Sequence, residues 1–292
     1  MKDLPRSGAP QKFTEHTERR LLRAMKKDPF QTCTEITRDL NEGMDEEEKV
    51  SVRTVRHHAN LKGLTTHRPW YKPGLTPVQI QARLNFAKMY ESKDMRFWRF
   101  VLFCDETRIK LYPRDCRKRV YRRRGVQFDR RYIYPTYYES RDSIMFWGCI
   151  SWEGQGELFE VQGTLDGPAY ASLLRHTIPL TLNNLNMQAA YLYQDHASCH
   201  DSKVVQNVFH ELQLRTLENQ PSNSPDLNPL EEVRGLWKDR VRARRPKTLN
   251  QLRSYAHQEW ENLTRDEIRK YIRSMPNRLH EVISFHGNNT KY

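Results

Sequence analysis

From residue 97 onward, short apolar runs alternate with segments of helical periodicity, and this alternation most strongly limits the possible folds. The apolar runs predict strands at 97–104, near 108–112, and at 143–151, 189–194 and 214–218. The intervening segments at 166–184 and 202–212 have helical periodicity, and from 229 the chain is almost wholly helical. Strands interleaved with helices predict an α/β core that begins with a meander and ends in a helical tail.

The N-terminal part has a different, purely helical pattern that predicts a separate small domain. Residues 1–13 are polar and rich in Pro and Gly, which is typical of a flexible lead-in. Residues 14–67 contain three short amphipathic helices, with candidate N-caps at Thr34 and Ser51. Prolines and then a renewed helical pattern at 68–96 indicate a linker and a connecting helix before the larger domain at 97–292.

The last of the three short helices has one apolar side, formed by Val52, Val55 and Ala59. Its other sides carry candidate DNA contacts, which are Arg53, Arg56 and His57. Three short helices of which the last is basic are typical of a helix-turn-helix module, whose last helix enters the major groove. A generic three-helix bundle shows the same pattern and stays open as an alternative.

The formal charge of +13 is concentrated in two blocks, at 114–131 and 234–253, each with a net charge of +7. Such blocks suit a polyanionic partner, because neutralising phosphates releases condensed counterions, although a solvated basic face is the plainer interpretation. Within the blocks the candidate DNA contacts are Arg119, Arg122, Arg123, Arg124, Arg242, Arg244 and Arg245.

The cysteine content and the hydropathy exclude two classes of protein. The five cysteines are odd in number and never spaced C-x-x-C, which argues against a disulfide framework and a structural zinc finger. Neither a membrane-spanning apolar stretch nor a signal segment is present. These features favour a soluble protein in the cytosol or nucleus.

Three carboxylates have positions that suit metal-dependent chemistry. Asp105 and Asp195 each directly follow an apolar strand, and Glu231 opens the helix after SPDLNP, with 35 residues between it and Asp195. Strand ends of an α/β sheet face an open crevice, and a divalent cation relieves the repulsion between carboxylates that converge there. Two Mg²⁺ would activate the attacking water or 3′-hydroxyl and stabilise the leaving oxygen at phosphorus. Each carboxylate alone is also compatible with a turn or helix-end role.

Zinc is an alternative suggested by His196, Cys199 and His200 close to Asp195. We disfavour it, because the two histidines follow a strand and fall in a loop, and no further Cys or His cluster completes a site. His200 is better explained as a residue that orients a metal ligand or contacts DNA.

Several motifs occur in a fixed order along the chain. They are RSGAPQK at 6–12, SVRTVRHHANLKGL at 51–64, LFCDETRIKLYP at 102–113, RKRVYRRRG at 117–125, IMFWGCISWEG at 144–154, YLYQDHASCHDS at 191–202, SPDLNPLEEVRGLW at 224–237 and SMPNRLHEVISFHGNNTKY at 274–292. This order resembles the Tc/mariner superfamily of DNA transposases, the Tc-type branch in particular. The similarity extends over essentially the whole chain.

The resemblance implies a ribonuclease H-like catalytic domain with a DDE triad at Asp105, Asp195 and Glu231. It also implies dependence on two Mg²⁺, with Mn²⁺ as a substitute, and cut-and-paste excision at the inverted terminal repeats of a transposon. Insertion at TA dinucleotides, a homodimer on double-stranded DNA and a nuclear location in a eukaryote follow from the same resemblance.

Three departures from the family pattern shape the expectations. The chain starts at the linker that normally follows a first helix-turn-helix, and the linker itself reads Gly8-Ala9-Pro10-Gln11 without the usual arginines for the minor groove. The Asp195–Glu231 interval is one residue longer than is usual in the Tc-type branch, which makes Glu232 a conceivable substitute for Glu231. A transposon-derived DNA-binding protein without activity, or a general ribonuclease H-like nuclease, are therefore the alternatives.

Overall fold

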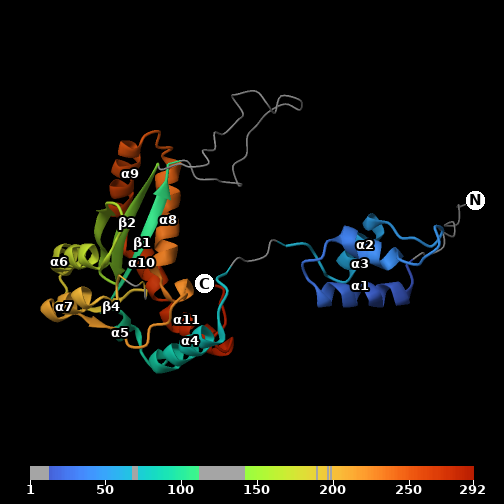
Figure 1. Ribbon diagram of the computed structural model, residues 1–292, viewed down its shortest axis with the longest axis horizontal. Coiled ribbons are helices and arrows are strands. Elements are labelled where there is room, and N and C mark those ends of the chain that lie inside the picture. The colour runs from blue at the N-terminus through green and yellow to red at the C-terminus, as the bar shows by residue number, and fades with distance from the viewer. Residues whose placement is uncertain (1–12, 68–71, 112–141, 189, 196, 198) are drawn as a thin grey trace, which may run out of the picture. The chain divides into compact units, whose positions relative to one another are not determined.

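The computed structural model describes residues 13–67, 72–111, 142–188, 190–195, 197 and 199–292 (Figure 1). These residues form two compact units, one up to 67 and one from 72. None of the helices in the described ranges is long and apolar enough to span a membrane.

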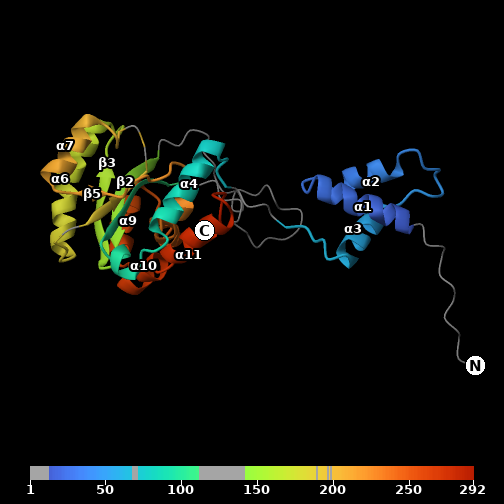
Figure 2. The same ribbon diagram turned by 90° about the horizontal axis from the view of Figure 1, so that it is seen from below.

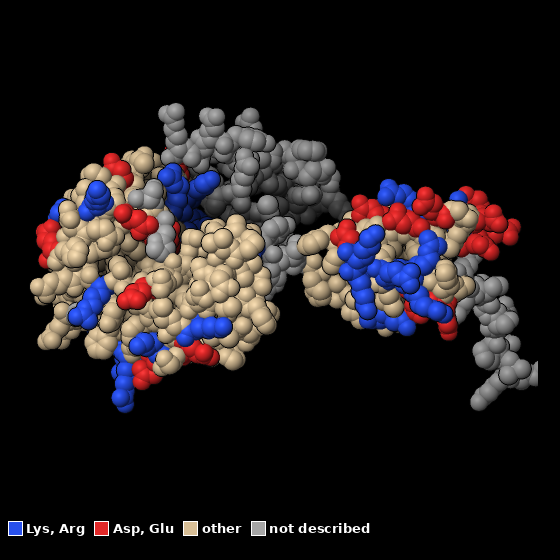
Figure 3. Space-filling view, turned by 60° about the horizontal axis from the view of Figure 1, so that its bottom comes forward, with Lys and Arg blue, Asp and Glu red and all other residues tan. Residues whose placement is uncertain are grey.

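The smaller unit consists of α1 (Glu15–Lys27), α2 (Cys33–Asn41) and α3 (Val52–Leu61), as the sequence predicted. Its core is the buried set Phe13, Leu21, Ile36, Leu40, Val50, Val55 and Ala59. Ser51 caps α3 as expected, but Thr32 rather than Thr34 caps α2, because the hydroxyl of Thr32 and the carboxylate of Glu35 close a reciprocal capping box. Figure 3 shows Lys and Arg side chains gathered on one part of this unit, apart from Asp and Glu side chains along its edges.

The larger unit is built on a five-stranded sheet in the order β3-β2-β1-β4-β5. Its strands are β1 (Val101–Lys110), β2 (Ser143–Ser151), β3 (Gly154–Val161), β4 (Tyr191–Tyr193) and β5 (Arg215–Thr216). β1, β2 and β3 form an antiparallel meander, as expected in kind, but its third strand, β3, was not predicted; β4 and β5 add parallel to β1. The separate strand expected near 108–112 is wrong: through Lys110 these residues continue β1, because β2 pairs with it along this whole length.

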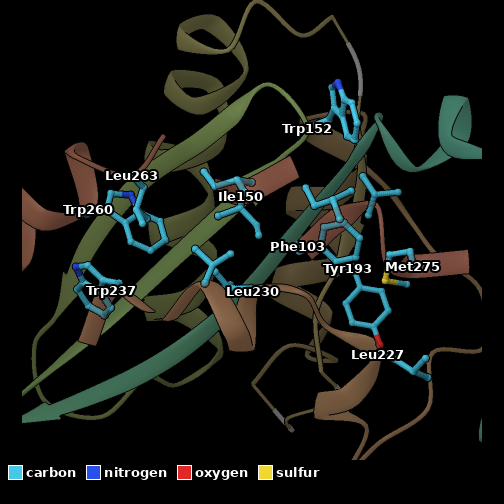
Figure 4. Packing of buried hydrophobic residues seen from close by; sticks show 14 of the residues in the cluster. Phe103, Ile150, Trp152, Tyr193, Leu227, Leu230, Trp237, Trp260, Leu263 and Met275 are labelled. Carbon is cyan, nitrogen blue, oxygen red and sulfur yellow. The ribbon is translucent and has the colours of Figure 1, made fainter. Parts of the chain in front are cut away.

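Helices cover both faces of the sheet (Figures 1 and 2). Adjacent β-strand side chains point to opposite faces, so Leu102 and Cys104 pack against α6 (Gly167–Asn184) and α7 (Lys203–Glu211). Val101 and Phe103 face the larger cluster on the opposite side, part of which Figure 4 shows. That cluster is formed with α4 (Pro77–Tyr90), α5 (Met95–Trp98), α8 (Leu230–Ala243), α9 (Leu249–Glu261), α10 (Arg265–Ile272) and α11 (Met275–Ser284).

Helix α4, which the sequence places between the two domains, packs against α11 within the larger unit. Its residue Arg83 is fully buried and joins both carboxylate oxygens of Asp226, at 2.7 and 2.6 Å. Asp226 lies in the short 3₁₀ helix η2 (Pro225–Leu227) that leads into α8. The connecting helix is therefore tied to the segment that positions the start of α8.

Candidate active site

Asp105 and Glu106 are consecutive residues of β1 and therefore point to opposite faces of the sheet. The parallel pairing with β4 ends at Phe103 and Tyr193, so beyond this point β1 is paired only with β2. The sequence pattern placed Asp105 directly after its strand, but in the structure β1 continues to Lys110. Asp105 lies where the neighbouring strand stops, which opens the same kind of crevice in the middle of a longer strand.

Asp195 lies just beyond β4, which ends at Tyr193, so one residue separates it from the strand that it was predicted to follow directly. That residue, Gln194, is buried and accepts a hydrogen bond of 2.6 Å from the hydroxyl of Tyr170 on α6. The Asp195 side chain is 58% exposed, and its Oδ1 lies 2.8 Å from Nδ1 of His200. The loop after β4 therefore has an anchored start and an exposed carboxylate oriented by a buried imidazole.

His200 lies between Asp195, after β4, and Glu106, on β1. Its side chain is 1% exposed, and its other ring nitrogen, Nε2, lies 3.2 Å from Oε1 of Glu106. The ring packs against Tyr170, with 4.2 Å between centroids. Because both nitrogens are engaged and the ring is buried, we assign His200 to orienting Asp195 rather than to contacting DNA.

Glu231 is the second residue of α8 and lies on the side of the sheet that Asp105 faces. Arg278 on α11 fixes this region, donating to the carbonyl oxygen of Asp226 and to Oε1 of Glu232, both at 2.7 Å. Glu232 is thereby directed to Arg278, whereas Glu231 is directed to the β1 side. This arrangement brings Glu231, and not its neighbour, to the carboxylate cluster.

Arg234, one turn along α8, bridges two of the carboxylates. Its Nη2 lies 2.6 Å from Oδ2 of Asp105 and 2.5 Å from Oε1 of Glu231. Its Nη1 donates to the carbonyl oxygen of Glu106. In the sequence Arg234 is one residue of a basic block, whereas in the structure it points into the acidic cluster.

The electrostatics of the cluster indicate a surplus of negative charge. The pKa of Asp105 is raised to about 7: burial is the largest cause, Arg234 opposes it, and the charges of Glu231, Glu106 and Asp195 add to the rise. For His200, burial lowers the pKa, but hydrogen bonds to Asp195 and Glu106 outweigh it and raise the value to about 11. A carboxylate whose ionised form is disfavoured by its neighbours is the situation that a bound cation relieves.

The donor set fits a hard divalent cation. Asp105, Asp195 and Glu231 offer carboxylate oxygens, the ligands that Mg²⁺ prefers. Glu106, Asp195 and His200 also each offer a possible ligand atom, and these three atoms lie within 4.8 Å of one another. Among the described residues, this is the group of His, Cys, Asp and Glu side chains close enough together to hold one metal ion. Cys199 is not part of this group, and His196 lies outside the described residues.

The candidate DNA contacts are distributed unevenly. Arg53, Arg56 and His57 are exposed on α3. Arg119, Arg122, Arg123 and Arg124 lie outside the described residues.

Within the second basic block, Arg242 pairs with Asp239 at 3.2 Å, and Arg245 is exposed. Arg244 pairs with Glu259 at 3.2 Å and stacks over Tyr255 at 3.8 Å. Several cations of this block therefore form ion pairs within the protein, which neither a DNA-binding surface nor a solvated basic face predicted.

Glu106 and Arg234 were not among the site residues predicted from the sequence, although Glu106 contacts His200 and Arg234 bridges two carboxylates. Glu106 had a usable signal, since it directly follows Asp105 in a strand and must face the opposite side. Arg234 stands three residues after Glu231, a spacing at which helical side chains meet. Its contact with Asp105 depends on how α8 packs on β1, which no local pattern encodes.

Two family models match the chain. A model of the Tc3-type helix-turn-helix, described as "Transposase", matches residues 18–92, and one described as "DDE superfamily endonuclease" matches residues 100–253, more than half of the chain. Among curated proteins, the transposable element Tcb1 transposase of Caenorhabditis briggsae is 31% identical over 276 residues, covering 94% of this chain and 100% of the relative. The transposable element Tc1 transposase of Caenorhabditis elegans is 29% identical with the same coverage.

Among solved structures, the Mos1 transposase paired-end complex with left transposon end has a TM-score of 0.80 at 16% identity, covering 98% of this chain and 82% of that chain. The catalytic domain of Mos1 mariner transposase has a TM-score of 0.58 at 14% identity, covering 76% of this chain and all of that domain. These similarities confirm the fold class: a helical N-terminal region, an α/β catalytic domain of the transposase type, and C-terminal helices. Together with the matched family models, they establish that the chain belongs to the Tc1/mariner family of transposases and is a DDE-type enzyme.

Proposed function

We propose that this protein catalyses cut-and-paste transposition, cleaving DNA at the inverted repeats of its transposon and joining the ends to a TA target. Asp105, Asp195 and Glu231 act as the catalytic triad. The observation that carries the proposal is that the three carboxylates lie close together. Asp105 and Glu231 both contact Nη2 of Arg234, and the charge of Asp195 raises the pKa of Asp105.

The three carboxylates would hold two Mg²⁺, with Mn²⁺ as a substitute. When bound, such ions activate a water or 3′-hydroxyl and stabilise the leaving oxygen at phosphorus. The protein supplies the positions: β1 holds Asp105, the loop anchored by Gln194 and His200 holds Asp195, and the Arg83–Asp226–Arg278 contacts hold the start of α8. No nucleophilic side chain is required by this chemistry.

DNA is the partner that this proposal requires. The exposed Arg53, Arg56 and His57 on α3 suit a recognition helix that enters a major groove. The Mos1 relatives were solved as a paired-end complex and as a strand transfer complex, which supports transposon ends as the ligand. We extend to this chain the homodimer on DNA and, in a eukaryotic host, a nuclear location.

The test uses the full chain with pre-cut DNA ends that carry the inverted repeats flanking its gene, a supercoiled target plasmid, and Mg²⁺ or Mn²⁺. We expect joining by the wild type, and loss of joining in Asp105→Asn, Asp195→Asn and Glu231→Gln. Glu232→Gln is the matched control and should retain joining, because Glu232 is directed to Arg278. Joining that survives in Asp105→Asn or Glu231→Gln would overturn the proposal.

A DNA-binding protein without nuclease activity is the second candidate, and the Arg234 bridge is the observation that favours it. This candidate predicts salt-dependent binding to the repeats with no nicking at any metal concentration. A general nuclease would nick the plasmid but leave the ends unjoined.

A further inference from the structure

Arg234 stands in the part of the site where a metal ion would be expected. Its residue is 6% exposed, and Nη2 alone contacts both Asp105 Oδ2, at 2.6 Å, and Glu231 Oε1, at 2.5 Å. The neighbouring nitrogen, Nη1, is anchored to the carbonyl oxygen of Glu106. The guanidinium is thus held between β1 and α8 by charge and by the backbone.

A divalent ion shared by Asp105 and Glu231 would need a carboxylate oxygen of each residue as a ligand. Nη2 of Arg234 already contacts one oxygen of each, Asp105 Oδ2 and Glu231 Oε1. The guanidinium would therefore compete with such an ion for these oxygens, and the two positive charges would repel each other.

The surroundings of Arg234 make its present position less than ideal. Its Nε is buried and has no hydrogen-bond partner within the described part of the chain. Lys238 follows one turn later on α8, and burial and the charge of Arg234 both lower its pKa. Two cations on one side of a helix next to the cluster oppose the addition of further positive charge.

We propose that Arg234 is an internal counter-ion of the metal-free site, which bridges Asp105 and Glu231 and competes with the divalent ion for them. This inference rests on the proposed function of the cluster. Arg234 stabilises the empty protein by cancelling carboxylate repulsion, and it weakens divalent-ion binding because it must release at least one carboxylate first. It is a positioning residue that sets the metal affinity of the site.

The test measures Mn²⁺ binding to the full chain, by the electron paramagnetic resonance signal of free Mn²⁺, and the unfolding temperature in EDTA and in Mn²⁺. The neutral variants are Arg234→Met and Arg234→Gln, the second of which keeps hydrogen-bond donors if the first does not fold. Arg234→Lys retains the charge. Arg240→Met is the matched control, because Arg240 lies on the same helix and pairs with Glu267.

We expect the neutral variants to bind Mn²⁺ tighter by about tenfold or more. They should unfold at a lower temperature than the wild type in EDTA and gain more from Mn²⁺. Arg234→Lys should behave like the wild type in Mn²⁺ affinity, and Arg240→Met should lower the unfolding temperature equally in both conditions.

Unchanged or weaker Mn²⁺ binding in both neutral variants would overturn the inference. Asp105→Asn separates this failure from a failure of the proposed function. If Asp105→Asn loses Mn²⁺ binding while the neutral variants bind as the wild type does, only the role of Arg234 is wrong. If Asp105→Asn binds Mn²⁺ as the wild type does, the carboxylate cluster is not the metal site.

Discussion

Replacing Arg83 by Met removes the cation from the most buried ion pair among the described residues. Arg83 is 0% exposed and Asp226 is 4% exposed. The guanidinium makes two bonds to the carboxylate, at 2.7 and 2.6 Å, and also donates to the carbonyl oxygen of Gly287 at 2.8 Å. Met fills a similar volume but leaves the Asp226 charge without its main partner.

The expected cost is set by the charge left behind. Removing one partner of a buried ion pair destabilises a protein by about 3–5 kcal/mol, because the other charge stays buried without compensation. Asp226 keeps a hydrogen bond of 2.9 Å from the Thr290 hydroxyl, so we expect the lower end of that range. With a typical dependence of unfolding free energy on urea, a loss of about 3 kcal/mol lowers the midpoint by roughly 1 M or more.

The assay is urea unfolding of the full chain followed by tryptophan fluorescence. Residues 13–67 contain no tryptophan, and five of the six tryptophans lie in the larger unit, so the signal mainly reports that unit. Arg96→Met is the control, because the Arg96–Asp94 pair is 3.9 Å long with both side chains largely exposed. Adding Asp226→Asn to Arg83→Met should recover part of the loss, because it removes the uncompensated charge.

An Arg83→Met variant no less stable than Arg96→Met would refute this reasoning. So would a double variant that is less stable than Arg83→Met alone. Either result would mean that the uncompensated charge of Asp226 contributes less to the loss of unfolding free energy than the ion-pair geometry predicts.

Four further outcomes follow. Because the Asp105 pKa is raised to about 7, Mn²⁺ affinity should fall by up to about tenfold per pH unit below that value and level off above it, and a pH-independent titration would contradict this. The pKa of Asp105 rises from 3.8 to about 7 on folding, so the folded state holds this proton more tightly than the unfolded state. Without metal, the free energy of unfolding should therefore fall as the pH rises from about 4 to about 7. Urea unfolding of Asp105→Asn should no longer show this pH dependence. Gly287→Ala should destabilise the protein by about 3 kcal/mol or more, because the added Cβ would lie 2.2 Å from a backbone oxygen of α4. Gly163→Ala is the control: Gly163 also has a positive φ but open space around it, so the loss should be only about 1 kcal/mol. Equal losses of the two variants in thermal unfolding would contradict the packing argument. His200→Ala should reduce DNA joining by about a hundredfold with DNA affinity unchanged in a gel-shift assay, because it releases Asp195; a loss of affinity instead would restore the role of a DNA contact.

Much of the fold was predictable because its signals are local. The strand at 143–151, the helix at 166–184 and the three N-terminal helices follow from periodicity and capping residues, which act within a few positions. The apolar run at 97–104 was predicted as one strand, but its first residues belong to α5 and β1 begins at Val101. Where a prediction was wrong, a longer-range contact decided. The break expected within β1 is absent, because pairing with β2 holds the exposed and polar second half of the strand in the sheet.

The candidate site was predictable as three residues but not as a network. The positions of Asp105, Asp195 and Glu231 relative to strands and a helix start are visible in the chain. Glu232 is an equally acidic neighbour of Glu231, and only the packing of α11 directs it to Arg278. Likewise, Arg234 and Arg240 are two similar cations of one basic block, and the tertiary structure sends one to the carboxylates and the other to Glu267.

The sequence by itself therefore determined most of the order of elements, the buried side of α3 and the family to which the chain belongs. These properties depend on residue type and spacing, which are written along the chain. Only the tertiary structure decided which charged side chains meet, because ion pairs between β1, the loop after β4 and α8 join residues about a hundred positions apart. For charges buried at such a junction, the partner rather than the residue type decides between a structural and a catalytic role.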